Sequence, residues 1–191
     1  VFMKKGKGTT VVIGVLIIVS AVILYSNSIK KRMVTEDEAE ISRQEELELL
    51  LDVDLDKDYP KDPRGTVEMF SRIIQMLYEN ISDEVTDVLA LKIRELYDEE
   101  LLAINSEKKY LNDLYTELAA IRESETTISK YLFVNEDQEG YDIIDGQEYA
   151  NIYVSYTMKQ KSRYIETKEF ILRKDEEGKW KILGWGPYKE D

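Results

Sequence analysis

The chain has 191 residues, of which 43% are hydrophobic, and this length allows one domain with a sizeable core plus some additional elements. Six of its 26 basic residues precede the first acidic residue, Glu36. Beyond Arg32 the remaining 20 basic residues face 39 acidic ones, a balance of −19 that is expected to repel nucleic acid. Because cysteine and histidine are absent, disulfides, thiolate and imidazole nucleophiles and the usual zinc and haem ligands are excluded, and no cofactor is expected.

An uncharged, strongly apolar segment lies near the start of the sequence. It runs from Gly8 to Ile29, which is 22 residues, and about 20 apolar residues suffice for a helix to cross a bilayer. A cleaved signal peptide is the alternative, but no small-x-small site follows, and a basic Lys-Lys-Arg run comes directly after the segment. We therefore predict an uncleaved transmembrane anchor within residues 1–32, with its apolar centre at Val11, Val12, Ile13, Leu16, Ile17, Ile18, Val22, Ile23 and Leu24.

The orientation of this anchor is less directly encoded. Three lysines precede the segment and three basic residues follow it, so the positive-inside count is tied. The short basic stretch before the segment and the large acidic region after it favour a cytoplasmic N-terminus and an extracytoplasmic C-terminal domain. We thus expect a single-pass protein of the cell membrane.

An acidic stalk and linker, residues 33–65, is predicted next. Leucines at loosely helical spacing among the acids of residues 35–52 indicate a solvated helix, with a partner-binding helix as the alternative. The alternating aspartates that follow resemble the start of a calcium-binding loop. Lys57 and Pro63, however, occupy the positions where that loop needs a glycine and a bidentate glutamate. A charged linker is therefore predicted, with the folded domain occupying residues 66–191.

Within this domain a helical pattern gives way to a β pattern. Apolar residues recur every three or four positions in residues 67–77, with Thr66 available as the N-cap, and again in residues 107–123 after two shorter segments. After Glu123 the period becomes two, and residues 149–158 alternate between an apolar and a more polar face. Helices followed by an antiparallel meander predict an α+β fold with the helices on one face of the sheet.

This order of elements resembles a known fold. The helical half contains "YPKDPRGTVEMFSRIIQMLY" and "RELYDEELL", and the strands end in "FILRKDEEGKWKILGW". Over roughly residues 59–188 the chain resembles the cone-shaped, cystatin-like fold of nuclear transport factor two and its bacterial relatives. With anchor and stalk included, it looks like a group of uncharacterised single-pass membrane proteins of anaerobic Firmicutes. The resemblance implies a curved sheet whose concave face and helices enclose a pocket, but it implies no particular activity.

Aromatic residues of the strands are the candidate site residues. Trp180 and Phe170 are expected on the same face, in the core or, together with Tyr156, as pocket-lining residues. Trp185 and Leu183 are expected on the opposite face, as an exposed or dimer-forming surface. A third feature is the basic turn with Lys159, Lys161 and Arg163. A solvated loop is the ordinary interpretation of such a turn, and docking to an acidic partner or a lipid head group is the alternative.

The sequence favours a membrane-tethered, extracytoplasmic binding or scaffold module without catalytic activity. Its expected partners are the lipid bilayer and either a cell-envelope protein or a second copy of the chain. One alternative is a structural subunit of a conjugation or type IV secretion-like assembly. Another is a small-molecule isomerase or lyase that uses an Asp and Tyr pair in the pocket, whereas a dehydratase-type site is excluded by the absence of histidine.

Overall fold

Helices come first and strands last, in the order that the sequence predicts. The computed structural model describes residues 40–134 and 139–188. It divides after Glu46, and the elements named below belong to the unit that starts at Leu47. They are the helices α2 (Pro63–Leu77), α3 (Asp83–Glu95), α4 (Glu99–Ile104) and α5 (Glu107–Glu123) and the strands β1 (Thr127–Phe133), β2 (Gly140–Ile144), β3 (Gln147–Lys159), β4 (Arg163–Lys174) and β5 (Trp180–Pro187). The α+β fold is thereby confirmed.

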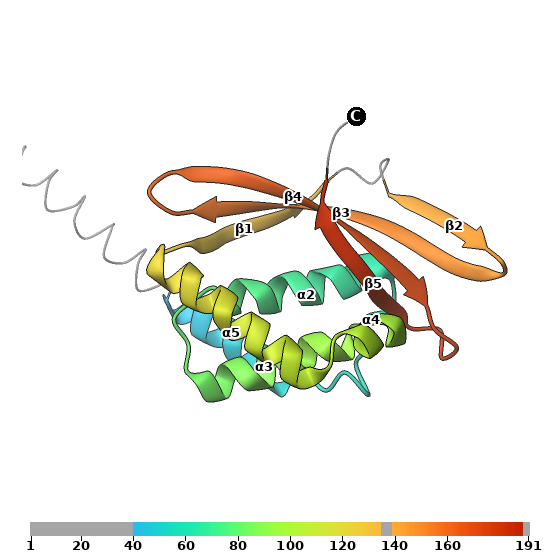
Figure 1. Cartoon of the computed structure of the whole chain (residues 1–191), viewed down its shortest axis with the longest axis horizontal. Helices are drawn as coiled ribbons and strands as arrows, with labels where there is room; N and C mark the ends of the chain where they lie inside the picture. The colour runs from blue at the N-terminus through green and yellow to red at the C-terminus, as the bar shows by residue number, and fades with distance from the viewer. Residues whose placement is uncertain (1–39, 135–138, 189–191) are drawn as a thin grey trace, which may run out of the picture. The chain divides into compact units, whose positions relative to one another are not determined.

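The strands form one antiparallel sheet around β3. Their order is β1-β3-β4-β5, and β2 also pairs with β3. β1 lies along the second half of β3 and β2 along its first half. The longest pairing joins β3 to β4, from Tyr149 opposite Arg173 to Lys159 opposite Arg163. The helices all lie on one face of the sheet, as Figure 1 shows.

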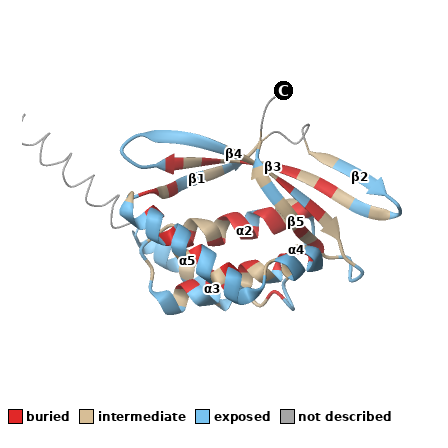
Figure 2. Ribbon diagram, in the orientation of Figure 1, coloured by how far each residue is buried: buried red, intermediate tan, exposed pale blue. Residues whose placement is uncertain are grey.

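The core fills the space between the helices and the sheet face that they cover. β3 alternates as its sequence predicts, since every second residue from Ala150 to Met158 is buried. The buried residues form stripes on α2 and on the strands that face it (Figure 2). Each fully buried side chain of this size contributes about 1.5–3 kcal/mol. The largest are Phe170, Leu50, Ile73, Leu77, Leu89, Ile93, Leu96, Leu118, Ile152, Leu172, Ile182 and Val67.

Helix α2 is capped by a different residue from the one expected. Asp62, not Thr66, is the N-cap of α2, and its carboxylate accepts a hydrogen bond of 2.7 Å from the amide of Gly65. Pro63 then occupies the first turn, where its missing amide proton costs nothing. Thr66 is fully buried inside the helix, and its hydroxyl donates to the carbonyl oxygen of Trp180 at 3.1 Å.

The folded unit also starts earlier than expected, because part of the predicted linker belongs to the core. Leu50 and Leu55 are buried there, with exposed fractions of 0% and 3%. Tyr59 donates its hydroxyl proton to the carbonyl oxygen of Trp180 at 2.9 Å. Apolar residues that pack in the core are therefore hidden within this acidic sequence. The folded domain begins near Leu47 instead of Thr66.

The predicted anchor falls outside the described residues. Among residues 40–134 and 139–188, no helix combines the length and the hydrophobicity that crossing a membrane requires. The apolar segment 8–29 is not part of these ranges. The transmembrane helix therefore stays a prediction from sequence.

Replacing Leu50 by alanine tests the earlier start of the domain. We expect Leu50→Ala to lower the free energy of unfolding by about 2–5 kcal/mol, because the side chain is fully buried and would leave a cavity. Its neighbour Leu49 is 60% exposed, so Leu49→Ala is a matched control that should change the free energy by less than about 0.5 kcal/mol. Urea unfolding of a fragment comprising residues 40–191, followed by circular dichroism, measures both. Equally small losses of free energy of unfolding in both variants would show that Leu50 belongs to a linker and not to the core.

Candidate functional site

A β-bulge near the end of the chain determines where the aromatic residues of β5 point. Leu172 of β4 pairs with Ile182 of β5, but the preceding residue of β4, Ile171, pairs with Gly184. Leu183 is thus the additional residue of the bulge, and the alternation of faces along β5 is displaced by one from that point. Phe170, which is fully buried, consequently pairs with Trp185.

Trp185 lies on the face of the sheet that the helices cover, the same face as Trp180. The expectation that Trp185 and Trp180 lie on opposite faces is therefore wrong, because it assumed an uninterrupted period of two. Leu183 is half-buried at the bulge. Whether Trp185 and Leu183 contact a partner stays a prediction.

The ring of Trp185 packs against three aromatic residues from different elements. Its centroid lies 5.2 Å from Phe70 of α2, 5.5 Å from Tyr97 and 6.2 Å from Phe170 of β4. Despite these contacts the residue is 38% exposed. One side of the indole is therefore fixed by the core, and another side is available to a ligand.

The exposed side of Trp185 lines a cleft of about 630 Å³, which we call the Trp185 cleft. β5 ends beside it, where the amide of Tyr188 donates to the carbonyl oxygen of Thr167 at 2.9 Å. Within the described residues no strand pairs with residues 163–166 of β4 on this side. The residues that line the cleft are Ile165, Glu166, Thr167, Lys168, Trp185, Gly186, Pro187 and Tyr188.

Lys168 supplies the cation of this cleft. It pairs with Val154, whose side chain is buried, so it also lies on the face of the sheet that the helices cover. Its ammonium nitrogen lies 5.8 Å from the ring centroid of Tyr156. Among the described residues it has no carboxylate partner. A half-buried, unpaired ammonium group next to an exposed indole suits a ligand with an apolar body and an anionic group.

Tyr156, whose ring lies near the ammonium group of Lys168, is held in the core. It is 2% exposed, and its hydroxyl is hydrogen-bonded to the hydroxyl of Ser71 at 2.7 Å. Burial raises the pKa of Tyr156 above its ordinary value, so the phenol is neutral at physiological pH. An isomerase of the kind considered above would need a tyrosine paired with an aspartate. The partner of Tyr156 is instead a serine, Ser71.

A second depression, the charged groove, has a volume of about 670 Å³. It lies at the end of the sheet where β4 turns into β5, and it is lined mostly by charged residues: Asp56, Arg94, Glu95, Asp98, Glu99, Arg173, Lys174, Asp175, Glu176, Glu177, Lys179 and Lys181. Tyr59, Tyr97, Leu55, Leu102 and Gln147 complete its walls.

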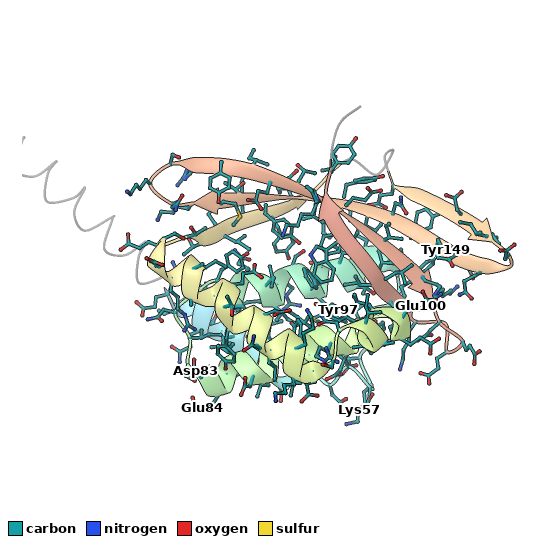
Figure 3. The ribbon with its side chains drawn as sticks, in the orientation of Figure 1. Lys57, Asp83, Glu84, Tyr97, Glu100 and Tyr149 are labelled. Atoms are coloured by element: carbon teal, nitrogen blue, oxygen red, sulfur yellow. The ribbon has the colours of Figure 1, made fainter. Side chains whose placement is uncertain are left out.

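The charged groove is built around one buried ion pair. Arg173 donates to both carboxylate oxygens of Asp98, at 3.0 and 2.6 Å, and to Glu100 at 2.7 Å. Hydrogen bonds to Glu100 and Asp98 raise the pKa of Arg173 further above its ordinary value, so its charge is permanent. Glu100 of α4 and Tyr149 of β3 lie at this end of the sheet (Figure 3), and both form hydrogen bonds with Arg173. The ion pair connects the helices to the sheet.

Two further cations of the groove are also engaged by the protein. Lys181 donates to the carbonyl oxygen of Glu95 at 2.7 Å and lies 4.3 Å from the ring centroid of Tyr59, and burial lowers the pKa of its ammonium group. Arg94 donates to the carbonyl oxygen of Asn105 at 2.8 Å. Because its groups stabilise the fold, this groove is a weaker candidate for a binding site than the Trp185 cleft.

The three residues predicted to line a pocket are buried in the core. Phe170, Tyr156 and Trp180 have exposed fractions of 0%, 2% and 6%, and none of them lines either depression. Sequence reasoning did not single out Lys168. Its position in the strand was a usable signal, because a lysine on the apolar face of a strand needs an explanation.

Breaking the buried ion pair should destabilise the domain strongly. Arg173→Met leaves the carboxylate of Asp98, which is 3% exposed, without its countercharge, and we expect a loss of about 3–5 kcal/mol. The neighbouring Lys174 pairs with Glu148 at the surface, at 3.0 Å, so Lys174→Met should cost less than about 1 kcal/mol. Urea unfolding of both variants makes the comparison. Similar losses in the two would show that the Arg173 pair has no special structural role.

Comparison with known proteins places the chain in a family. No curated protein matches it. A family model described as a domain of unknown function (DUF6715) matches residues 3–185, which include the apolar segment near the start and almost all of the α+β unit. The chain therefore belongs to the DUF6715 family.

Proposed function

We propose that this chain is a single-pass membrane protein whose extracytoplasmic α+β domain is a non-catalytic binding or scaffold module. The Trp185 cleft carries this proposal. It combines a partly exposed indole, whose other side packs against the core, with the half-buried ammonium group of Lys168, which has no carboxylate partner among the described residues. Such a combination binds a ligand through an apolar contact and one charged contact.

The membrane anchor in this proposal rests on sequence. Residues 8–29 carry no charge and are long enough to cross a bilayer, and basic residues flank them on both sides. The family match begins at residue 3 and continues through this segment into the α+β unit. Both parts therefore belong to one family unit, which supports a domain that works next to a membrane.

We further propose that the domain has the cone-shaped, cystatin-like fold of nuclear transport factor two. The layer of helices on one face of an antiparallel sheet and the β-bulge in β5 support this assignment. In such a fold, ligands enter between the helices and the curved sheet. The Trp185 cleft lies on that face, at the end of β5, and is open to solvent.

The chemistry of the buried groups favours binding over catalysis. The carboxylate of Asp98 is buried and Arg173 holds both of its oxygens, and the largely buried carboxylate of Glu139 is paired with Arg64 at 3.3 Å. Tyr156 is neutral and paired with Ser71. Neither arrangement is an acid–base pair in the Trp185 cleft, where the carboxylate in the lining, Glu166, is at an exposed position.

A protein segment is a second candidate occupant. Residues 163–166 of β4 have no neighbouring strand on the cleft side within the described part of the chain, and Ile165 is 68% exposed there. An extended peptide can add to such an edge as a further strand. This occupant fits the scaffold role and the alternative of a subunit in a secretion-like assembly.

The anionic dye 8-anilinonaphthalene-1-sulfonate is a direct probe of the Trp185 cleft, since it joins aromatic rings to one sulfonate. We expect saturable binding to the fragment of residues 40–191, with fluorescence enhancement. Lys168→Gln should weaken the binding about tenfold or more through loss of a charged contact.

Lys174→Gln is the matched control, because Lys174 lies on the same strand but pairs with Glu148. It should leave the dissociation constant unchanged. Unfolding curves of both variants show that the fold is intact. Equal binding to the wild-type protein and to Lys168→Gln would contradict this cleft as the anion-binding site.

Cysteine labelling tests the anchor and its orientation, because the chain contains no cysteine of its own. We expect Glu176→Cys, which is in an exposed turn, to react with a membrane-impermeant maleimide in intact cells. Lys5→Cys should react only after permeabilisation, and the protein should stay in the membrane after an alkaline wash. Labelling of Lys5→Cys alone in intact cells would reverse the orientation, and release by the wash would contradict the anchor.

A further inference from the structure

The turn that joins β3 to β4 is basic in a strongly acidic chain. No aspartate or glutamate occurs between Glu148 and Glu166, although 39 of the 191 residues are acidic. Within this stretch the turn carries three cations, Lys159, Lys161 and Arg163, all of them exposed. Lys130 of β1 adds a fourth nearby, because it pairs with Thr157.

These four cations are not used by the fold. Among the described residues, none of them has a carboxylate partner. The cations of the charged groove behave differently, since Arg173, Lys174 and Lys179 all form ion pairs. The charge of the turn is therefore available to an external partner.

Two apolar side chains follow the cations along β4, on opposite faces of the strand, since Tyr164 pairs with Met158 and Ile165 with Thr157. Tyr164 is 40% exposed and Ile165 is 68% exposed. We call the group Lys159, Lys161, Arg163, Tyr164 and Ile165 the hairpin tip. A mixture of lysine and arginine with tyrosine and isoleucine is suited to the boundary between lipid head groups and acyl chains.

The hairpin tip is separated from the acidic turn between β4 and β5, although Glu166 follows the tip on β4 and Glu125 lies two residues before Thr127, the partner of Lys159. It lies at the opposite end of the sheet from the turn between β4 and β5, which contains Asp175, Glu176 and Glu177 (Figure 1). At physiological salt, charges screen one another beyond about 8 Å. An anionic surface that approaches the tip therefore meets the cations, while the acidic turn at the other end is too distant to repel it.

We propose that the hairpin tip docks onto the anionic lipid head groups of the membrane to which the chain is tethered. The three cations of the tip line neither the Trp185 cleft nor the charged groove. Lys159 and Arg163 pair across the hairpin and so lie on one face of it, with Lys161 in the turn between them. Charge complementarity to a bilayer thus identifies the occupant, since the tip combines three exposed cations with two exposed apolar side chains.

The tether can reach this position. Residues 30–46 separate the predicted span from the folded unit, which is 17 residues. A chain of this length covers about 26 Å as a helix and up to about 60 Å when extended. A folded unit of this size has a radius of gyration of about 15 Å. Confinement at this distance raises the effective concentration, so weak contacts with lipid are sufficient.

The inference rests on the anchor of the proposed function, and reconstitution of the full chain tests the two separately. A Ser162→Cys variant, labelled with an environment-sensitive nitrobenzoxadiazole dye, reports on the hairpin tip. We expect a blue shift and protection from an aqueous quencher in vesicles of phosphatidylcholine and phosphatidylglycerol, but not in phosphatidylcholine alone. Raising the salt concentration should reverse both effects.

Neutralising the tip should abolish the docking. The Lys159→Gln, Lys161→Gln, Arg163→Gln triple variant is expected to lower the docking constant on the order of 100-fold, from the loss of three basic contacts. A label at Glu176→Cys, in the distant turn, is the matched control and should stay aqueous in both kinds of vesicle. These substitutions are at exposed positions, so the fold should be unchanged.

Each contrary result has a distinct meaning. A chain that does not incorporate into vesicles overturns the anchor, whereas a chain that incorporates but keeps an aqueous label at Ser162→Cys overturns the docking. An equal blue shift in both lipid mixtures also overturns it, because the contact would then not depend on charge. Protection by soluble polyglutamate but not by anionic vesicles would assign the tip to an acidic protein.

Discussion

The connection between Leu96 and Asp98 is the constraint on which the rest of the domain depends. This segment lies beside β5, with hydrogen bonds of 2.9 Å from the amide of Asp98 to the carbonyl of Ile182 and 2.8 Å from the amide of Ile182 to the carbonyl of Leu96. The carboxylate of Asp98 is then clamped by Arg173. Because α3 ends and α4 begins at this segment, two helices are placed against the sheet at one point.

The same segment determines the site. Tyr97, between Leu96 and Asp98, packs its ring against Trp185. The β-bulge at Leu183 directs Trp185 toward that ring, so the indole is held by the helical layer on one side and by β4 on the other. The Trp185 cleft therefore depends on both the β-bulge, which orients Trp185, and the Leu96–Asp98 connection, which supplies Tyr97. A domain with regular alternation in β5 would present its last tryptophan on the opposite face.

Local patterns in the sequence predict the elements and much of the core, but not the register at the site. The alternation from Ala150 to Met158 identifies the buried face of β3, because a period of two has one structural meaning. The cap of α2 was also encoded, since Asp62 followed by Pro63 is a typical helix start. The bulge left only Gly184 in the strand as a signal. The contact between Asp98 and Arg173, 75 residues apart, left none.

The hairpin tip and the Trp185 cleft adjoin along β4, so the distribution of charge bears on how the cleft would be oriented at a membrane. Ile165 belongs to both, and Lys168 follows three residues later on the same strand. A domain that docks through the tip would hold the mouth of the cleft close to the head groups, while its acidic surfaces stay in solvent. An amphiphile with an anionic group could then enter the cleft from the bilayer surface, with its charge at Lys168 and its apolar part on Trp185. The tether, the basic turn and the bulge would thus each define one part of a single binding geometry.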